Sequence, residues 1–194
     1  MIPKNTATVV MFLLRNTDKF GYNINQIAKL NKISVGSAFK ILKELEKDRL
    51  ITKNEISNAS HYTLNFDNPE TTKLCEFLLL AEKRNLKGYA KLYADEIITF
   101  KDAKMIVIFG SVLRGKEFND VDVIFITNKV KKVNNFCLEI SKVKTKPVVP
   151  LIMKQEDLIK ALKQKKEAII NLMKEGIVVK GESVFLEVVK NVNS

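Results

Sequence analysis

The stretch that decides the fold is IVIFGSVLRGKEFNDVDVIFIT, residues 106–127. It consists of an apolar run, a Gly-Ser pair, a short basic loop, and an Asp-x-Asp pair at the start of a second apolar run. Two short apolar runs rich in β-branched residues and separated by turn residues predict two β-strands. The order of these parts predicts a phosphate-sized anion site beside a pair of carboxylates.

Gly110 and Ser111 supply the anion half of this site. A glycine directly after a strand lets the backbone approach a ligand closely, and the N–H groups of the next helical turn point at an anion. The Ser111 hydroxyl adds a donor, while Arg114 and Lys116 lie one turn further on and can neutralise phosphate charge. A Gly-Ser pair also occurs in ordinary tight turns, so the pair alone is weak evidence.

Asp120 and Asp122 supply the cation half. A spacing of two on a strand directs both side chains to the same face, with Cα atoms ~6.6 Å apart. Two such carboxylates converge on one hard cation or on two cations about 3.5–4 Å apart. Aspartate is disfavoured in strands, so the pair predicts a metal site for Mg²⁺. The alternative is a strand that starts at the surface, with Asp120 capping the loop.

Together these residues resemble the nucleotidyltransferase signature of the DNA polymerase β superfamily, in particular the minimal nucleotidyltransferases of archaea and bacteria. The similarity covers roughly residues 86–190 and includes the segment EGIVVKGE, residues 175–182. It implies transfer of a nucleoside monophosphate from an NTP to an acceptor, with release of pyrophosphate. The catalytic and Mg²⁺-binding residues would be Asp120 and Asp122, and the nucleotide-binding residues would be Gly110, Ser111, Arg114, Gly115 and Lys116.

The chain departs from the family pattern in three places, one of which is the loop over residues 115–120, which is a residue or two shorter. Asn119 stands where the family has serine, and the later predicted strand, residues 147–153, carries no third carboxylate. Glu139 falls in a predicted helix, and Glu156 and Asp157 fall just past the strand. Two carboxylates can hold one Mg–nucleotide but support in-line transfer less well. Three functions stay open: an enzyme that nucleotidylates a partner such as a toxin-like protein, a DNA-binding regulator that senses nucleotide, and a binding module without either activity.

Three predicted helices precede a predicted β-hairpin in the first third of the chain. Asn23 or Asn25 can cap the second helix, residues 31–33 form a turn, and Ser34 can cap the third helix. The strands of the hairpin are predicted over residues 50–53 and 61–66. The third helix has a predicted inner face of Val35, Ala38, Leu42 and Leu45 and an outer face of Ser37, Lys40, Glu44 and Lys47.

This order resembles the winged helix-turn-helix fold over about the first 66 residues. The resemblance implies binding of double-stranded DNA, with the second helix of the motif in the major groove. Non-specific DNA binding and docking of a protein are the alternatives, and a homodimer that reads paired half-sites is compatible with the fold. The predicted DNA-binding residues are Ser34, Ser37 and Lys40 at base edges and Lys43, Lys47 and Lys53 at phosphates.

The remaining chain predicts a second, α/β domain with a small mixed sheet, because strands and helices alternate. Residues 66–70 form the boundary, and Pro69 suits the first position of a helix. The predicted division is a winged helix over 1–66, a linking helix over 67–85 and a nucleotidyltransferase-like domain over 86–194. The predicted strands cover 105–109, 121–126, 147–153 and 177–180, and the predicted helices cover 71–84, 89–100, 130–143, 155–174 (closed by Gly176 as a left-handed cap) and 182–192.

The composition narrows the class of protein. The 194 residues carry 33 Lys and Arg against 22 Asp and Glu, a net charge of +11, which fits a polyanionic partner or simply a lysine-rich chain. A single histidine, His61, excludes His-rich zinc sites. Cys75 and Cys137 each stand alone and predict buried, reduced thiols. The lack of an apolar run near 20 residues or of a signal peptide predicts a cytoplasmic protein without a membrane partner.

Overall fold

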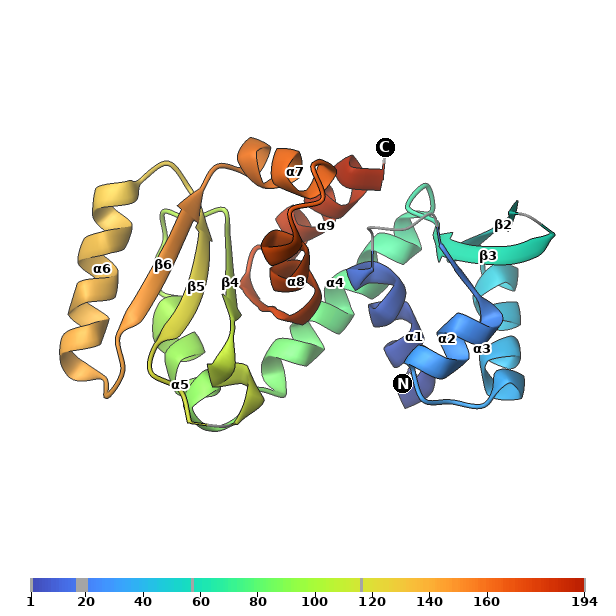
Figure 1. Cartoon of the computed structure of the whole chain (residues 1–194), viewed down its shortest axis with the longest axis horizontal. Coiled ribbons are helices and arrows are strands. Elements are labelled where there is room, and N and C mark those ends of the chain that lie inside the picture. The colour runs from blue at the N-terminus through green and yellow to red at the C-terminus, as the bar shows by residue number, and fades with distance from the viewer. Residues whose placement is uncertain (1, 17–20, 57, 116, 194) are drawn as a thin grey trace. The chain divides into compact units, whose positions relative to one another are not determined.

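The chain folds into two compact units, Met1–Leu78 and Leu79–Val192. The structure is a computed structural model that describes residues 2–16, 21–56, 58–115 and 117–193. Within these residues it contains nine α-helices, one 3-10 helix and two β-sheets, so the predicted α/β class is confirmed. Figure 1 shows the elements and labels most of them.

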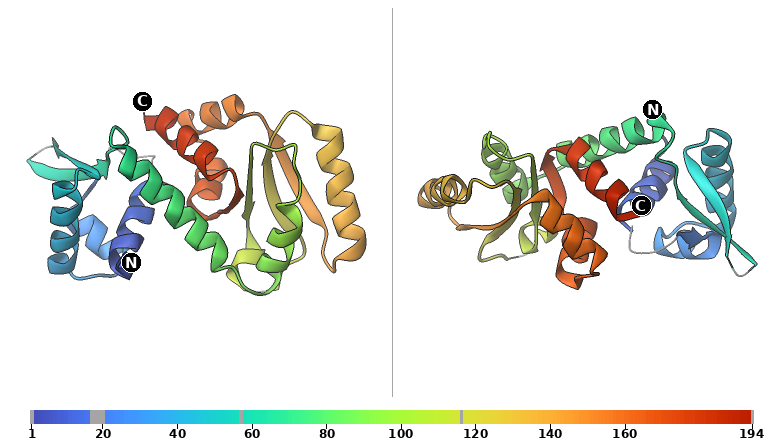
Figure 2. Two further views of the ribbon diagram at one scale, coloured as in Figure 1. Left: turned by 180° about the vertical axis from the view of Figure 1, so that it is seen from behind. Right: turned by 90° about the horizontal axis from the view of Figure 1, so that it is seen from above.

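The first unit combines three helices with a three-stranded antiparallel sheet of order β1-β3-β2. The predicted hairpin is confirmed, and its strands extend past the helices in both figures (Figures 1 and 2). Strand β1 was not predicted, because two residues are too short to show a period; Tyr22 pairs with Tyr62. The elements are α1 Lys4–Arg15, β1 Tyr22–Asn23, α2 Ile24–Leu30, α3 Val35–Lys47, β2 Ile51–Ile56 and β3 Ala59–Leu64.

Side-chain caps begin α2 and α3, as the sequence predicts. The Asn23 side chain accepts a hydrogen bond from the Gln26 N–H, and the Gln26 side chain accepts one from the Asn23 N–H. At the next helix the Ser34 hydroxyl oxygen accepts from the Ser37 N–H at 3.1 Å. Each cap satisfies donors that the first helical turn leaves without a partner, and so fixes where its helix begins.

The buried face of α3 differs from the prediction at one position. Ala38, Leu42 and Leu45 are buried as expected, and Ile41 is buried with them. Val35 was predicted to face inward, but its side chain is 49% exposed. Val35 lies in the first turn, about 60° around the helix from Ala38, and its spacing alone does not distinguish it from a core residue.

The second unit contains a four-stranded mixed sheet of order β6-β5-β4-β7. β4 runs antiparallel to β5 and to β7, whereas β5 and β6 are parallel. This confirms the predicted mixed sheet. The strands are β4 Met105–Phe109, β5 Val121–Ile126, β6 Val148–Met153 and β7 Ile177–Lys180.

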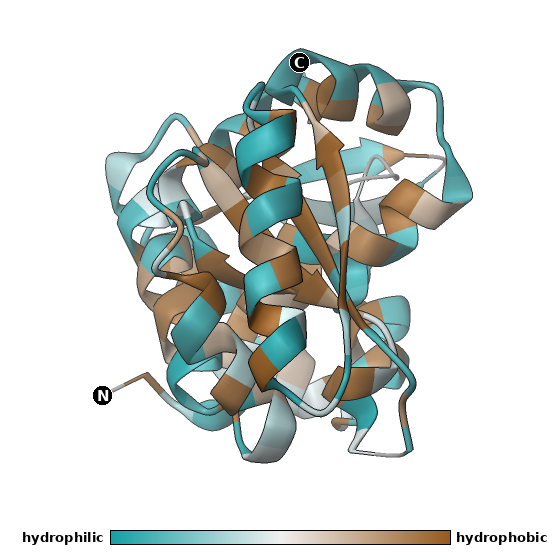
Figure 3. Cartoon of the chain, turned by 90° about the vertical axis from the view of Figure 1, so that its left-hand side faces the viewer, coloured by the Kyte–Doolittle hydropathy of each residue, from teal (hydrophilic) through white to brown (hydrophobic). Residues whose placement is uncertain are grey.

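Two helices, α5 Gly88–Ile97 and α6 Val130–Val143, cover one face of this sheet. Val121, Val123 and Phe125 of β5 belong to the core on that face. Because side chains alternate along a strand, Asp122 lies on the opposite face. Figure 3, which looks toward α6, shows hydrophobic strands behind a helix of mixed character.

The predicted long helix over residues 155–174 is wrong. It is interrupted near Lys165, which has a φ of 55°, and forms α7 Gln155–Lys163 and α8 Glu167–Glu175. Gly176 is not a left-handed cap either, because its φ is −73° and its ψ is 148°. A Cβ at Gly176 would stand 2.6 Å from the Val107 side chain and from the Leu172 carbonyl oxygen, so close packing requires this glycine. Helix α9 follows over Glu182–Asn193.

Helix α4 spans Pro69–Arg84 and begins at the predicted proline. Cys75 on this helix and Cys137 on α6 are buried, as predicted, and neither is in a disulfide. Burial raises the pKa of the Cys137 thiol to about 11. Phe77 on α4 is 52% exposed. No helix among the described residues is long and apolar enough to cross a membrane.

Candidate functional site

Gly110 joins β4 to the 3-10 helix η1, Ser111–Arg114, in a conformation that only glycine adopts readily. Its φ is 84° and its ψ is −157°. The antiparallel register pairs Phe109 with Asp122, which brings Asp122 beside the end of β4. The Asp122 carboxylate lies against the Cα of Gly110, in the space that a Cβ would fill. The turn is therefore built for close approach of backbone and carboxylate.

We expect Gly110→Ala to destabilise the second unit. The backbone region is strained for alanine by about 1–3 kcal/mol, and the new Cβ would displace the Asp122 carboxylate. The free energy of unfolding from urea titrations measures the loss. Gly36→Ala is the matched control, since nothing lies within 4 Å of a Cβ there and alanine favours a helix by roughly 1 kcal/mol. Equal behaviour of the two variants would contradict the role given to Gly110.

The two aspartates are electrostatic neighbours, although only one belongs to the strand. β5 begins at Val121, as predicted, so Asp120 is the loop residue directly before the strand. Both residues are half-buried. Burial raises the pKa of the Asp122 carboxyl, and the negative charge of Asp120 raises it further. A cation would offset both effects, because oxygen ligands of this kind bind Mg²⁺.

The other predicted nucleotide-binding residues follow Gly110 along η1. Ser111 begins the helix, and Gly115 ends it in the left-handed conformation, with a φ of 64°. Arg114 donates to Glu175 at 2.9 Å, and both side chains are more than 60% exposed. An exposed ion pair contributes little to stability, at most ~1 kcal/mol. Arg114 can therefore leave Glu175 and bind a phosphate instead. Lys116 lies outside the described residues.

The register between β5 and β6 shows which residue of β6 lies beside Asp122. A third carboxylate would be expected at this position. Asp122 pairs with Val149, whose side chain is 44% exposed. Glu139 lies on α6, which covers the other face, and pairs with Lys142. Glu156 and Asp157 follow the far end of β6, beyond Met153, which pairs with Ile126. Among the described residues, no three His, Cys, Asp or Glu side chains form a metal-sized group.

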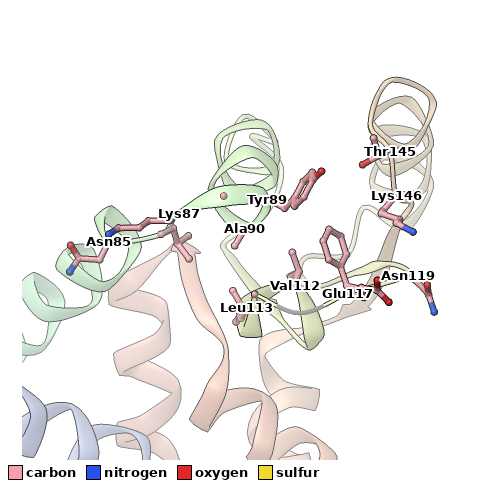
Figure 4. A pocket seen from close by; sticks show the side chains of 14 residues that line it. Asn85, Lys87, Tyr89, Ala90, Val112, Leu113, Glu117, Asn119, Thr145 and Lys146 are labelled. Atoms are coloured by element: carbon pink, nitrogen blue, oxygen red, sulfur yellow. The ribbon is translucent and has the colours of Figure 1, made fainter.

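A cavity of about 1010 Å³ lies beside the loop that leads to Asp120, and the sequence did not predict it. Gly115 and Asn119 line it, whereas the two aspartates do not. Figure 4 shows Tyr89 of α5 and Lys146 at its wall. The Phe118 ring meets Tyr89 edge to face, with 5.4 Å between ring centroids. In the sequence, the only sign of this cavity was Phe118, an aromatic residue in a loop of turn residues. The cavity could not be predicted from it, because the other lining residues come from segments far apart in the sequence.

A second candidate site lies on α3, where three lysines share the solvent face. Lys40, Lys43 and Lys47 are all exposed. At 100° per residue they lie within about 60° of one another, opposite the buried residues of the helix. This stripe of positive charge is positioned to contact a polyanion.

The side chains of Ser34 and Lys53, two of the other predicted DNA-binding residues, have structural partners. The Ser34 hydroxyl oxygen caps α3 by accepting from the Ser37 N–H. In the hairpin, Lys53 pairs with Glu55 at 3.2 Å, and Ser60 donates to the same carboxylate at 2.8 Å. The hydrogen bond with Glu55 and its negative charge raise the pKa of Lys53. Lys53 stays cationic, but Glu55 competes with phosphate for it.

Comparison of the chain with protein-family models, with curated proteins and with solved structures finds no match. The functional assignment therefore depends on the geometry of the residues described above.

Proposed function

We propose that this protein is a DNA-binding regulator that combines a winged helix over residues 1–66 with a nucleotidyltransferase-like domain that binds Mg²⁺–NTP. The observation that carries the nucleotide half is the contact between Asp122 and Gly110. It brings a half-buried carboxylate, a second carboxylate at Asp120 and a glycine turn into one small region. These are the parts that a triphosphate and its cation need.

The Mg²⁺ ion fits the donors that the chain offers. Asp120 and Asp122 would hold it through carboxylate oxygens, and the ion would neutralise charge on the phosphates of the nucleotide. Ser111 and the backbone at Gly110 would contact the triphosphate. Arg114 would leave Glu175 to do the same.

Binding without transfer is favoured by Val149. An apolar side chain stands beside Asp122 on the neighbouring strand, where an additional carboxylate would complete a two-metal site. Among the described residues, the chain therefore offers ligands for one Mg–nucleotide, and β6 carries no carboxylate beside Asp122 to activate an acceptor hydroxyl. This supports a nucleotide sensor.

Transfer to a partner is the second candidate function, and the cavity favours it because Gly115 and Asn119, which line it, belong to the loop between the glycine turn and Asp120. The acceptor oxygen would attack the α-phosphorus of the NTP, and the bond to the pyrophosphate leaving group would break. The acceptor would be a hydroxyl group of a protein such as a toxin-like partner.

Nucleotide binding is tested by titrating the full chain with each of the four NTPs by calorimetry, with Mg²⁺ or with EDTA. We expect Mg²⁺-dependent binding of at least one NTP. No binding of any NTP in Mg²⁺ would overturn the nucleotide half of the proposal.

Transfer is tested separately, with α-³²P-labelled NTPs and the candidate partner. If the protein is a nucleotide sensor, we expect no label on the partner. Label that appears on the partner with the wild-type chain and disappears with Asp122→Ala would show that the protein is an enzyme and not a nucleotide sensor.

The lysine stripe of α3 supports the DNA half, and it predicts a specific salt dependence. Lys40→Ala and Lys43→Ala are each expected to weaken binding to duplex DNA and to lower the slope of log K against log[salt] by about 1. Fluorescence anisotropy at several salt concentrations measures both quantities. Lys73→Ala, an exposed lysine on α4, is the matched control. Unchanged slopes in both α3 variants would show that this face does not contact phosphates.

A further inference from the structure

Helix α3 exposes two large apolar side chains next to its lysines. Val35 is 49% exposed and Phe39 is 56% exposed. They are four residues apart, so they lie one above the other on the same side of the helix. Neither contributes to the buried face formed by Ala38, Leu42 and their neighbours.

The apolar pair borders the positive stripe directly. On a helix with 100° per residue, Phe39 lies about 40° from Lys43, and Val35 lies about 40° from Phe39. The surface of α3 therefore offers a row of ammonium groups with an apolar edge along one side. Its occupant must combine negative charge with apolar contact points at a matching spacing.

The major groove of B-DNA has this combination. It admits an α-helix, its walls are phosphates, and each thymine presents a C5-methyl group on its floor. RNA fits less well, since its major groove is too deep and narrow for side chains to read and uracil lacks the methyl group. The serines of α3 provide little hydrogen-bond discrimination between bases, because a hydroxyl group can pair with more than one kind of base.

We propose that Val35 and Phe39 read thymine methyl groups and give the protein a preference for A·T-containing sites. This inference rests on the proposed DNA binding of α3. The lysines supply affinity through phosphates, and the apolar edge supplies selection among sequences. Burial of one methyl group corresponds to ~0.8 kcal/mol, or about a fourfold change in affinity.

The test compares duplexes that differ only in that methyl group. The full chain is titrated by fluorescence anisotropy against alternating duplexes of dA and dT and the same duplexes with dU in place of dT. We expect tighter binding of the thymine duplex, by about fourfold for each methyl group that is buried. Phe39→Ala is expected to lower this ratio by about fourfold and to keep the salt slope. Val35→Thr, which replaces an apolar methyl by a hydroxyl, is expected to reduce the ratio.

Phe77→Ala is the matched control, because Phe77 is an exposed phenylalanine of similar accessibility on α4. It is expected to leave the thymine-to-uracil ratio unchanged. Equal binding of the two duplexes by the wild-type chain would overturn the methyl-reading proposal and leave DNA binding intact. No binding of either duplex would overturn DNA binding itself. A further outcome is that the chain self-associates, that Phe39→Ala removes this self-association, and that the two duplexes bind equally. Val35 and Phe39 would then form a protein interface instead.

Discussion

Asp122→Asn is expected to weaken Mg²⁺-dependent NTP binding by about a hundredfold, within the roughly 2–5 kcal/mol that the loss of one partner of a charge pair costs. The substitution keeps the shape of the side chain and its contact with Gly110 but removes the negative charge that binds the cation. Calorimetric titration with NTP, in Mg²⁺ and in EDTA, measures the effect.

The same variant is expected to be more stable than the wild type when Mg²⁺ is absent. Burial and Asp120 raise the pKa of Asp122 in the folded chain, so its charged form opposes folding. Stability from this group is fully present below the unfolded pKa near 3.8 and is lost as the pH rises through the folded value. The thermal midpoint of the variant should exceed that of the wild type at neutral pH, and the difference should vanish at acidic pH.

Asp157→Asn is the matched control for Asp122→Asn. It makes the same chemical change in the first turn of α7, past the far end of β6. We expect wild-type binding of Mg²⁺–NTP. If both variants bind Mg²⁺–NTP like the wild type, the cation site is not at Asp122. If both lose binding, Asp157 takes part in binding, and the site is not the one described around Asp122 and Gly110.

Val149→Asp is expected to convert a nucleotide-binding site into one that binds a second metal ion. Neighbouring strands lie about 4.8 Å apart, so a carboxylate at position 149 would stand beside Asp122 on the same face of the sheet. In EDTA the added charge should destabilise the unit through repulsion, and Mg²⁺ should restore the loss. We expect about a tenfold gain in Mg²⁺ affinity, in the range by which ligand shells change metal affinity. Mn²⁺ or Mg²⁺ titration followed by thermal melts measures it.

Leu151→Asp provides a close control for this gain. Leu151 lies two residues further along β6 on the same face, is 37% exposed, and pairs with Ile124 rather than with Asp122. It should lose a similar amount of stability without gaining metal affinity. Identical metal titrations for the two variants would refute the assignment of position 149 as the missing ligand site.

Local signals in the sequence were sufficient for much of the fold. Strands β4, β5 and β7 and helix α6 begin and end where the apolar runs and turn residues predict. The caps at Asn23 and Ser34 were predicted as well, because a cap depends on residues two or three positions away. These features are decided by neighbours along the chain, so the chain alone specifies them.

Other features could not be predicted, because their causes lie far away in the sequence. The break at Lys165 interrupts an apolar pattern that reads as one helix. Gly176 was assigned to a left-handed cap, whereas close contact with Val107 of another strand explains it. Val35 and Phe39 both have helical spacing, and only the packing of α3 shows that neither is buried.

The sequence by itself determined the α/β class, the short strands on either side of the Gly-Ser turn, and the presence of two carboxylates two residues apart. These follow from hydrophobic periodicity and turn chemistry, which act over a few residues. Only the tertiary structure decided what surrounds Asp122: Gly110 beneath its carboxylate and Val149 beside it. The physical reason is strand register, which depends on pairing and burial of segments that are distant along the chain.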